Sequence, residues 1–337
     1  MRRRPKRLRR AGAAALIAAL GLGLVGAAPA GPAIAYPAPA QLPPVTSTTV
    51  DDRYAATGQA VRDALAVATA ADEPQRAATL ASLTGRQLLE FDARGNGRAV
   101  EVIGDLAGAE RVAVVVPGSH TTLDTFDRNH GPGGGARALA AEVAAVDPGA
   151  EVAVVAWLGY DTPQGISPRS LTDGLAGAGA DALKATVESI RRVNRHAPIS
   201  LLCHSYGSVV CGTAAADLPV AELALYGSPG VGVASAAALG TTARVWAGRG
   251  AADPIRFVPF VRVAGIGFGT DPVAPEFGAR TFAAGTGGHG DYHLPGSQAL
   301  RSLALIALGK AVSEAERQRS RAVKRPEWEP AGAVPDA

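Results

Sequence analysis

Cysteine is scarce in this sequence of 337 residues, which contains only Cys203 and Cys211, eight positions apart. Two cysteines at this spacing do not form the paired pattern of a zinc site. The sequence also lacks internal repeats, and no second long apolar run follows the one at the N-terminus. We therefore expect no zinc finger, no repeat architecture and no membrane span in the body of the chain.

Basic residues are in excess only near the N-terminus. The whole chain has 33 basic and 30 acidic residues, a formal net charge of +3. Residues 1–35 hold seven of the basic residues and none of the acidic ones, so the other 302 residues carry 26 against 30, a net charge of −4. Because this part has no basic stripe, we expect no nucleic-acid partner.

The first 35 residues have the order of a signal peptide. Met1–Arg10 is strongly basic, residues 11–28 are almost entirely small or apolar, and small residues at Ala28-Pro29-Ala30 and Ala33-Ile34-Ala35 are candidate cleavage sites. We expect a secreted protein, extracellular or associated with the cell wall. The alternative is an uncleaved membrane anchor, since the apolar run is only slightly shorter than the roughly 20 residues that span a bilayer.

Composition divides the rest of the chain into four segments. Residues 36–50 are rich in Pro, Ala and Thr and are expected to form an extended linker. We expect an N-terminal helical segment at 51–86, the main domain at 87–312, and a charged, Pro-rich tail at 313–337. No stable membrane span is expected once the leader is cleaved.

Short apolar runs alternate with amphipathic stretches along the main domain. The runs predicted to be strands are Gln87–Phe91, Ala99–Ile103, Val112–Val116, Val152–Trp157, Ile199–Cys203, Ala221–Tyr226, Ala243–Ala247 and Arg280–Ala283. The stretches predicted to be helices are Asp51–Ala71, Glu73–Leu83, Ala136–Val146, Leu171–Asn194, Ser208–Leu218 and Ser297–Ala311. Asn96-Gly97 predicts an antiparallel hairpin between the first two strands. The later alternation predicts an α/β fold, with a mostly parallel sheet and helices on both faces.

One turn between a strand and a helix contains a candidate nucleophile, Ser205. The sequence Cys203-His204-Ser205-Tyr206-Gly207 follows an apolar strand and leads into an apolar helix. A serine at such a turn has its hydroxyl held out in strained backbone geometry, and the N–H of Tyr206 would be one donor to an oxyanion. The alternative is an ordinary structural turn.

A nucleophilic serine needs a base and a carboxylate, and candidates for both follow in the chain. Asp253 comes after an apolar strand and precedes a proline, which places its carboxylate on a rigid loop. His289 lies among glycines after the next strand and is the first candidate for the base, with His293 in reserve. Asp291 is the reserve carboxylate.

A metal or phosphate site is the less favoured interpretation of two segments. His289, Asp291 and His293 alternate along the chain, but no further metal-ligand motif accompanies them. The glycine-rich segment Gly131–Gly135 has no Gly-Lys-Ser/Thr after it and no strand before it, so we expect a mobile loop rather than a phosphate loop. No cofactor is expected.

The second oxyanion donor is expected in the loop that follows the third strand. Gly118 would permit close backbone approach, with Ser119 as the first candidate for the donated N–H and His120 as the second. An ordinary turn at the strand end is the alternative. Trp157 and Tyr160 end the next strand and could either line an acyl pocket or belong to the core.

Cys203 occupies a position where glycine is usual in such elbows. Cys211 lies two turns along the following helix, at a similar depth, and an exported protein is found where disulfides persist. We therefore hypothesise a Cys203–Cys211 disulfide behind the serine. The alternative is a pair of buried free thiols.

Taken together, these motifs resemble an actinobacterial family of α/β hydrolases catalogued as a domain of unknown function. The likeness spans roughly Gln87 to Lys310 and is carried by Val116-Pro117-Gly118, Trp157-Leu158-Gly159-Tyr160, Cys203–Ser208, Asp253-Pro254 and His289-Gly290-Asp291-Tyr292. It implies an α/β-hydrolase fold and a triad of Ser205, Asp253 and His289, but no particular substrate.

The expected activity is hydrolysis of a small-molecule or lipid-like ester through an acyl-enzyme, with thioesters and amides less favoured. A non-catalytic binding or cell-wall-associated module that retains the fold is the alternative from another class, because fold membership does not prove catalysis. Acyl transfer is a further alternative, since exclusion of water decides which acceptor reacts.

Overall fold

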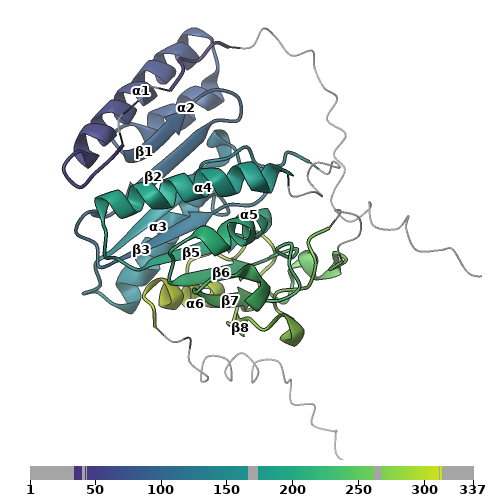
Figure 1. The fold of residues 1–337 in the computed structure, drawn as a ribbon. Helices are drawn as coiled ribbons and strands as arrows, with labels where there is room; N and C mark the ends of the chain where they lie inside the picture. Colours follow the sequence, from purple (N-terminus) through teal and green to yellow (C-terminus); the bar gives the residue numbers. More distant parts are fainter. Residues whose placement is uncertain are drawn as a thin grey trace, which may run out of the picture. The chain divides into compact units, whose positions relative to one another are not determined.

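The computed structural model describes residues 34–39, 42, 44–165, 174–261, 267–310 and 312 (Figure 1). The chain divides into two compact units, Met1–Ala35 and Tyr36–Ala337, and every helix and strand below belongs to the second. Residues 1–33 of the predicted signal peptide lie outside the described residues, as do 171–173 of a predicted helix and the predicted tail 313–337. The predicted divisions of the chain stay predictions.

A single sheet of eight strands forms the centre of this unit. The strands are β1 (Gln87–Asp92), β2 (Arg98–Ile103), β3 (Arg111–Val116), β4 (Val152–Leu158), β5 (Ile199–His204), β6 (Glu222–Tyr226), β7 (Arg244–Gly248) and β8 (Arg280–Thr281). Their order across the sheet is β1-β2-β4-β3-β5-β6-β7-β8. β1 and β2 pair antiparallel, as does β2 with β4, and every pair from β4 to β8 is parallel. The predicted fold class is confirmed.

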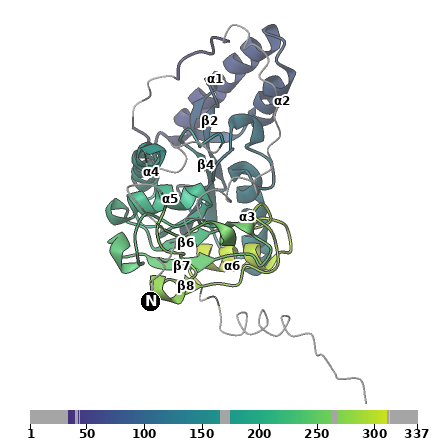
Figure 2. The same ribbon diagram turned by 90° about the vertical axis from the view of Figure 1, so that its right-hand side faces the viewer.

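Helices cover both faces of the sheet (Figure 2). They are α1 (Val50–Ala70), α2 (Pro74–Leu83), α3 (Pro132–Val146), α4 (Gly174–Val193), α5 (Tyr206–Ala214) and α6 (Gln298–Ala307). Short 3₁₀ helices are Leu123–Thr125, Ala215–Asp217, Ala237–Leu239, Pro254–Phe257 and Pro275–Phe277. One core cluster joins α4 and α5 to the sheet, and a second joins α1, α2, α3 and α6 to its other face. Alternate residues of β3, such as Val114 and Val115, belong to different clusters, as the period of a strand requires.

The two N-terminal helices cover the edge strand β1. The hydroxyl of Thr57 on α1 donates to the carbonyl oxygen of Leu88 at 2.6 Å. On α2, the guanidinium of Arg76 donates to the Asp124 carboxylate and to the Ala93 carbonyl, each at 2.7 Å. An exposed edge would offer unpaired backbone groups to other chains, and these contacts cover part of it.

The glycine-rich segment before α3 corrects one prediction. Instead of a mobile loop, Gly131 is the N-cap of α3 and Pro132 is its first residue. A Cβ on Gly133 would lie 2.5 Å from the Asp127 Oδ1 atom, and one on Gly134 would lie 2.3 Å from the Arg128 carbonyl oxygen. The glycines are therefore required by close packing of the first turn against the preceding chain.

The parallel strands direct their carboxyl ends toward one edge of the sheet. The loops that follow β3, β5 and β7 begin with Pro117, Ser205 and Arg249, so Ser119, Ser205 and Asp253 all lie at this edge. Ligands of open α/β sheets bind outside the carboxyl ends of the strands. Over the described residues, no helix is both long enough and apolar enough to cross a membrane.

Candidate active site

Ser205 lies at the junction between β5 and α5. Its backbone has φ 52° and ψ −127°, which is unusual for a residue with a side chain. Its N–H donates to the Tyr226 carbonyl oxygen at 3.0 Å, and its own carbonyl oxygen accepts from the Ser208 hydroxyl at 2.6 Å. The neighbouring strand and the helix thus hold a strained conformation that a free chain would relax.

Two glycines allow the Ser205 turn to approach β3. A Cβ on Gly118 would lie 2.6 Å from the Ser205 Cβ and 3.1 Å from its Oγ. A Cβ on Gly207 would lie 2.5 Å from the carbonyl oxygen of Pro117. No side chain fits at either position, so the loop after β3 lies directly against the serine.

The structure brings the three predicted triad residues into one chain of hydrogen bonds. The Nε2 atom of His289 is 2.9 Å from the Ser205 Oγ. On the other side of the ring, Nδ1 lies 2.9 Å from Oδ1 and 3.0 Å from Oδ2 of Asp253. The Asp253 side chain is fully buried, whereas 33% of the His289 side chain is exposed, so solvent reaches the imidazole but not the carboxylate.

Asp253 is held as a carboxylate although it is buried. Burial by itself raises the pKa of Asp253, but hydrogen bonds from His289, from Tyr292 and from the Ile255 N–H bring this pKa below its usual value. The Ile255 N–H donates to Oδ1 at 2.8 Å. Hydrogen bonds to the charged form favour ionisation, so Asp253 is a negative acceptor for the His289 ring.

His204, the neighbour of Ser205, supports the His289 loop. Its Nε2–H donates to the His289 carbonyl oxygen at 2.9 Å, and the two rings have centroids 4.8 Å apart. Burial lowers the pKa of His204 well below its usual value, with His289 and His293 adding to the effect. The ring is therefore neutral. No local pattern indicated a role for this residue, because its partner lies 85 positions further along the chain.

The reserve candidates His293 and Asp291 lie elsewhere. The His293 ring is 5% exposed, and its Nε2 atom is 2.9 Å from the hydroxyl of Tyr226. The Asp291 carboxylate accepts from the Gly288 N–H at 2.7 Å, within its own turn. No hydrogen bond joins either side chain to Ser205 or to the His289 ring, and no cluster of three potential metal ligands occurs among the residues described.

The N–H groups of Ser119 and His120, the two candidate oxyanion donors in the loop after β3, differ in their hydrogen bonding. The His120 N–H donates to the Pro163 carbonyl oxygen at 2.9 Å, and its residue has φ 60°, so this N–H is already used. No hydrogen bond of the Ser119 N–H to another described residue is seen. Of the two candidates in this loop, Ser119 is therefore the better placed donor. The N–H of Tyr206, the first residue of α5, stays the predicted donor on the helix.

Trp157 and Tyr160 belong to the core rather than to a pocket wall. Trp157 is fully buried, and its Nε1–H donates to the Thr186 hydroxyl at 3.0 Å. The Tyr160 hydroxyl donates to the Pro117 carbonyl oxygen at 3.0 Å, and its ring stacks on Trp157. Tyr160 therefore holds the loop that contains Ser119.

Cys203 and Cys211 form a disulfide. Both residues are fully buried, and their Cα atoms are 6.5 Å apart. The bond joins the penultimate residue of β5, two positions before Ser205, to the middle of α5. The side chain at the position where glycine is usual is thus accommodated by a covalent link.

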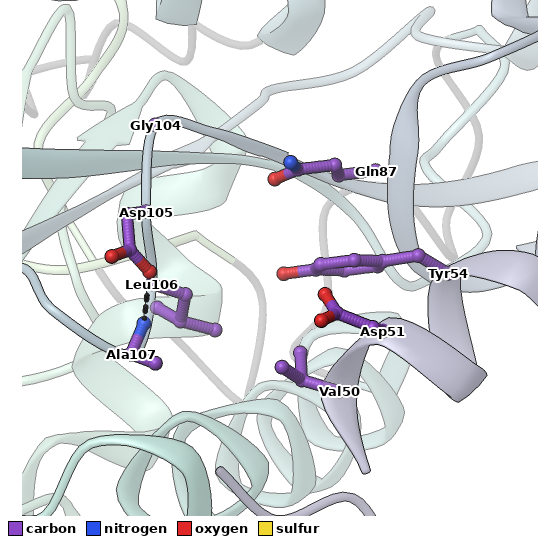
Figure 3. Close-up of a pocket in the computed structure, with 8 residues that line it drawn as sticks. All are labelled: Val50, Asp51, Tyr54, Gln87, Gly104, Asp105, Leu106 and Ala107. Atoms are coloured by element: carbon purple, nitrogen blue, oxygen red, sulfur yellow. Dashed lines mark hydrogen bonds between the residues drawn. The ribbon is translucent and has the colours of Figure 1, made fainter. Parts of the chain in front are cut away.

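A separate cavity lies at the opposite edge of the sheet (Figure 3). Its volume is about 180 Å³, and the residues that line it are Val50, Asp51, Tyr54, Gln87, Gly104, Asp105, Leu106 and Ala107. Gly104 follows β2, which runs antiparallel to β4, and a Cβ on Gly104 would lie 3.3 Å from the carbonyl oxygen of Val152 at the start of β4. The cavity contains none of the predicted site residues.

Comparisons with known proteins agree with this architecture. Residues 92–263, about half of the chain, match the family described as Alpha/beta hydrolase. The uncharacterized protein Rv2079 of Mycobacterium tuberculosis is 33% identical over 248 residues, covering 64% of this chain and 37% of that protein. The chain thus spans well under half the length of this relative.

Two solved structures are similar at low sequence identity. A serine hydrolase homologue from Coxiella burnetii is 16% identical, with a TM-score of 0.39, over 66% of this chain and 94% of that chain. Esterase LipW from Mycobacterium marinum is 14% identical, with a TM-score of 0.40, over 74% of this chain and 89% of that chain. Because about half of its residues match the alpha/beta hydrolase family and its sheet has the eight-stranded order described above, this chain belongs to that family.

Proposed function

We propose that this protein is a serine hydrolase that cleaves carboxylic esters through an acyl-enzyme on Ser205. The observation that carries the proposal is the continuous chain of hydrogen bonds from the Ser205 Oγ through His289 to Asp253. A nucleophile, a base within hydrogen-bond reach and a group that orients the base are the parts that this chemistry needs.

In the first half of the reaction, the Ser205 Oγ attacks the ester carbonyl carbon while the His289 Nε2 accepts the hydroxyl proton. Asp253 stabilises the imidazolium that forms and keeps Nδ1 protonated. The N–H groups of Ser119 and Tyr206 donate to the oxyanion. The imidazolium then returns its proton to the leaving alcohol, and the acyl group stays on Ser205.

In the second half, His289 accepts a proton from a water molecule, which attacks the acyl carbon. Collapse of the second tetrahedral intermediate breaks the bond to the Ser205 Oγ, which regains its proton from His289. The acid product leaves and the starting state is restored. The partial exposure of His289 leaves room for this water.

The chain segment that follows Asp253 supports an apolar substrate. Phe257 is 67% exposed and Val261 is 55% exposed, and both follow Asp253 on the same loop. The guanidinium of Arg256 lies 4.6 Å from the centroid of the Phe257 ring. Exposed apolar side chains on a segment that begins at a site residue suit the acyl or alcohol part of a lipid-like ester.

Export is part of the proposal. Disulfides persist in oxidising compartments, and the buried bond between Cys203 and Cys211 supports a protein that folds outside the cytosol. N-terminal sequencing of the protein recovered from culture medium should show cleavage after Ala30 or Ala35. Recovery of the full chain from membranes instead would favour an uncleaved anchor.

A panel of p-nitrophenyl esters of increasing acyl length tests the proposed activity. We expect turnover of at least one ester, and a fall of about a thousandfold or more in Ser205→Ala, which keeps the fold but lacks the nucleophile. If the wild type hydrolyses none of the panel, or if Ser205→Ala matches the wild type, the proposal is wrong.

A further inference from the structure

We propose that Tyr292 is a positioning residue that fixes the Asp253 carboxylate toward His289, so that the hydrogen-bonded chain has four members. The inference rests on the proposed function, because it assigns a role within the same site. Tyr292 occurs in the His289-Gly290-Asp291-Tyr292 motif, but the sequence alone did not connect it to Asp253.

The Tyr292 hydroxyl has two partners, and both belong to the segment that contains Asp253. It donates to the Asp253 Oδ2 atom at 2.5 Å and accepts from the Gly250 N–H at 3.1 Å. Tyr292 is only 3% exposed, so water does not compete freely for these bonds. Because Gly250 precedes Asp253 by three residues, one hydroxyl fixes both the carboxylate and the backbone of its loop.

Each oxygen of the Asp253 carboxylate has a donor of its own. Oδ1 accepts from the Ile255 N–H at 2.8 Å, and Oδ2 accepts from the Tyr292 hydroxyl. His289 Nδ1 lies within 3.0 Å of both oxygens. If the Tyr292 hydroxyl were removed, the buried Oδ2 would share only the His289 N–H, and the carboxylate could rotate about χ2.

His289 and Tyr292 hold the carboxylate from a single tight turn. The Asp291 N–H donates to the Gly288 carbonyl oxygen at 3.2 Å, and the Asp291 carboxylate accepts from the Gly288 N–H at 2.7 Å. The turn therefore sets the separation of the imidazole and the phenol. The imidazole of His289 and the phenol of Tyr292 therefore reach the Asp253 carboxylate together. This arrangement is expected if Tyr292 orients that carboxylate toward His289.

Besides Tyr226, whose ring centroid lies 5.2 Å from that of Tyr292, three charged or titratable groups among the described residues act on this pair. His289 and His204 lie beside Tyr292 and Asp253, and Arg249 acts on the Tyr292 hydroxyl from the loop after β7. Burial raises the pKa of Tyr292, and the hydrogen bond to Asp253 adds to this, so the phenol stays protonated and remains a donor.

The test compares Tyr292→Phe with Tyr226→Phe as a matched control. Tyr226 is fully buried, and its hydroxyl contacts His293 and the Leu202 carbonyl but not Asp253. Phenylalanine keeps the ring that packs on Tyr292 and the main-chain carbonyl that accepts from Ser205, so only this hydroxyl is lost. With a soluble p-nitrophenyl ester, we expect kcat to fall about tenfold or more in Tyr292→Phe, while KM changes less than about twofold, because a buried hydrogen bond to a charged group is lost. Tyr226→Phe should keep kcat within about twofold of the wild type.

The pH profile of kcat/KM separates positioning from mere packing. Without the phenol, the Asp253 charge is less dispersed and stabilises the protonated base more, so the acidic limb should move to higher pH in Tyr292→Phe. Incorporation of 3-fluorotyrosine at position 292 strengthens the donor and should move this limb to lower pH while kcat is retained. The fluorinated protein also provides the test if Tyr292→Phe does not fold.

The proposal is overturned if Tyr292→Phe, folded as judged by thermal unfolding, has wild-type kcat and an unmoved acidic limb. It is also overturned if the two variants at position 292 shift the limb in the same direction. Reaction of wild-type Ser205 with a fluorophosphonate is measured alongside. If Ser205 is labelled but Tyr292→Phe changes neither kcat nor the acidic limb, only the role of Tyr292 is rejected. If Ser205 is not labelled, the proposed function itself is rejected.

Discussion

Individual residues of the site are held by neighbours whose roles the sequence does not reveal. Ser205, Asp253 and His289 could be predicted because each occurs in a pattern of strand, glycine and loop that suits its chemistry. His204 and Tyr292 act through hydrogen bonds to residues 85 and 39 positions away in the chain. Such pairings depend on how the loops meet in space, so a local pattern cannot predict them.

Gly227 packs closely against Asp253 and His289. Its φ is 54°, and a Cβ there would lie 3.1 Å from the Asp253 Oδ2 and 3.2 Å from the His289 Cε1. We expect Gly227→Ala to reduce kcat about tenfold or more, because small displacements of reacting groups are costly. Gly95→Ala is the control, since Gly95 has φ 58° and no atom within 4 Å of a Cβ, so it has the backbone strain without the contact. Equal activity of the two variants would contradict this account of Gly227.

His293 has a structural role that depends on pH. Burial lowers the pKa of His293 to about 4, although its hydrogen bond to the Asn129 backbone opposes this. The unfolded chain therefore binds a proton more readily, and stability falls as the pH decreases from about 6.5 toward 4. In urea titrations at pH 7.5 and at pH 5, the free energy of unfolding should fall in both proteins. We expect the fall to be smaller in His293→Gln than in the wild type, by about 2 kcal/mol. Parallel pH dependence in the two proteins would show that His293 does not contribute it.

Among the elements, β5 and α5 are joined covalently as well as by packing. The sequence favoured a disulfide because Cys203 and Cys211 lie on consecutive elements of an exported chain. It could not decide the question, since the crossing of strand and helix is a property of the folded sheet. The start of α3 was mispredicted for a related reason: local preference makes Gly133 and Gly134 poor helix residues, but close packing against residues 126–128 requires them.

Removal of the disulfide should lower stability. The double variant Cys203→Ala/Cys211→Ala closes no loop in the unfolded chain, and we expect it to lose about 2–3 kcal/mol of unfolding free energy in urea. Dithiothreitol should bring the wild type close to the variant and leave the variant unchanged. Wild-type stability that does not respond to the reductant, together with free thiols detected by mass analysis without reduction, would contradict the presence of the bond.

At the scale of the whole molecule, the alternation of strands and helices was sufficient to predict two helical layers around a mostly parallel sheet. The strand order was not predicted. β4 lies between β2 and β3, and it is antiparallel to β2 but parallel to β3. This order depends on pairing between segments more than 40 residues apart in the chain. This order brings the loops after β3, β5 and β7 to one edge, and the candidate site results from that convergence.

The central claim is that Ser205 is a nucleophile activated by its neighbours. Reaction of the folded wild-type protein with a fluorophosphonate, followed by peptide mapping, tests it most directly. We predict one covalent adduct per chain, located on Ser205, absent in Ser205→Ala and formed much more slowly in His289→Ala. No adduct on the wild type, or equal labelling of wild type and Ser205→Ala, would contradict the account.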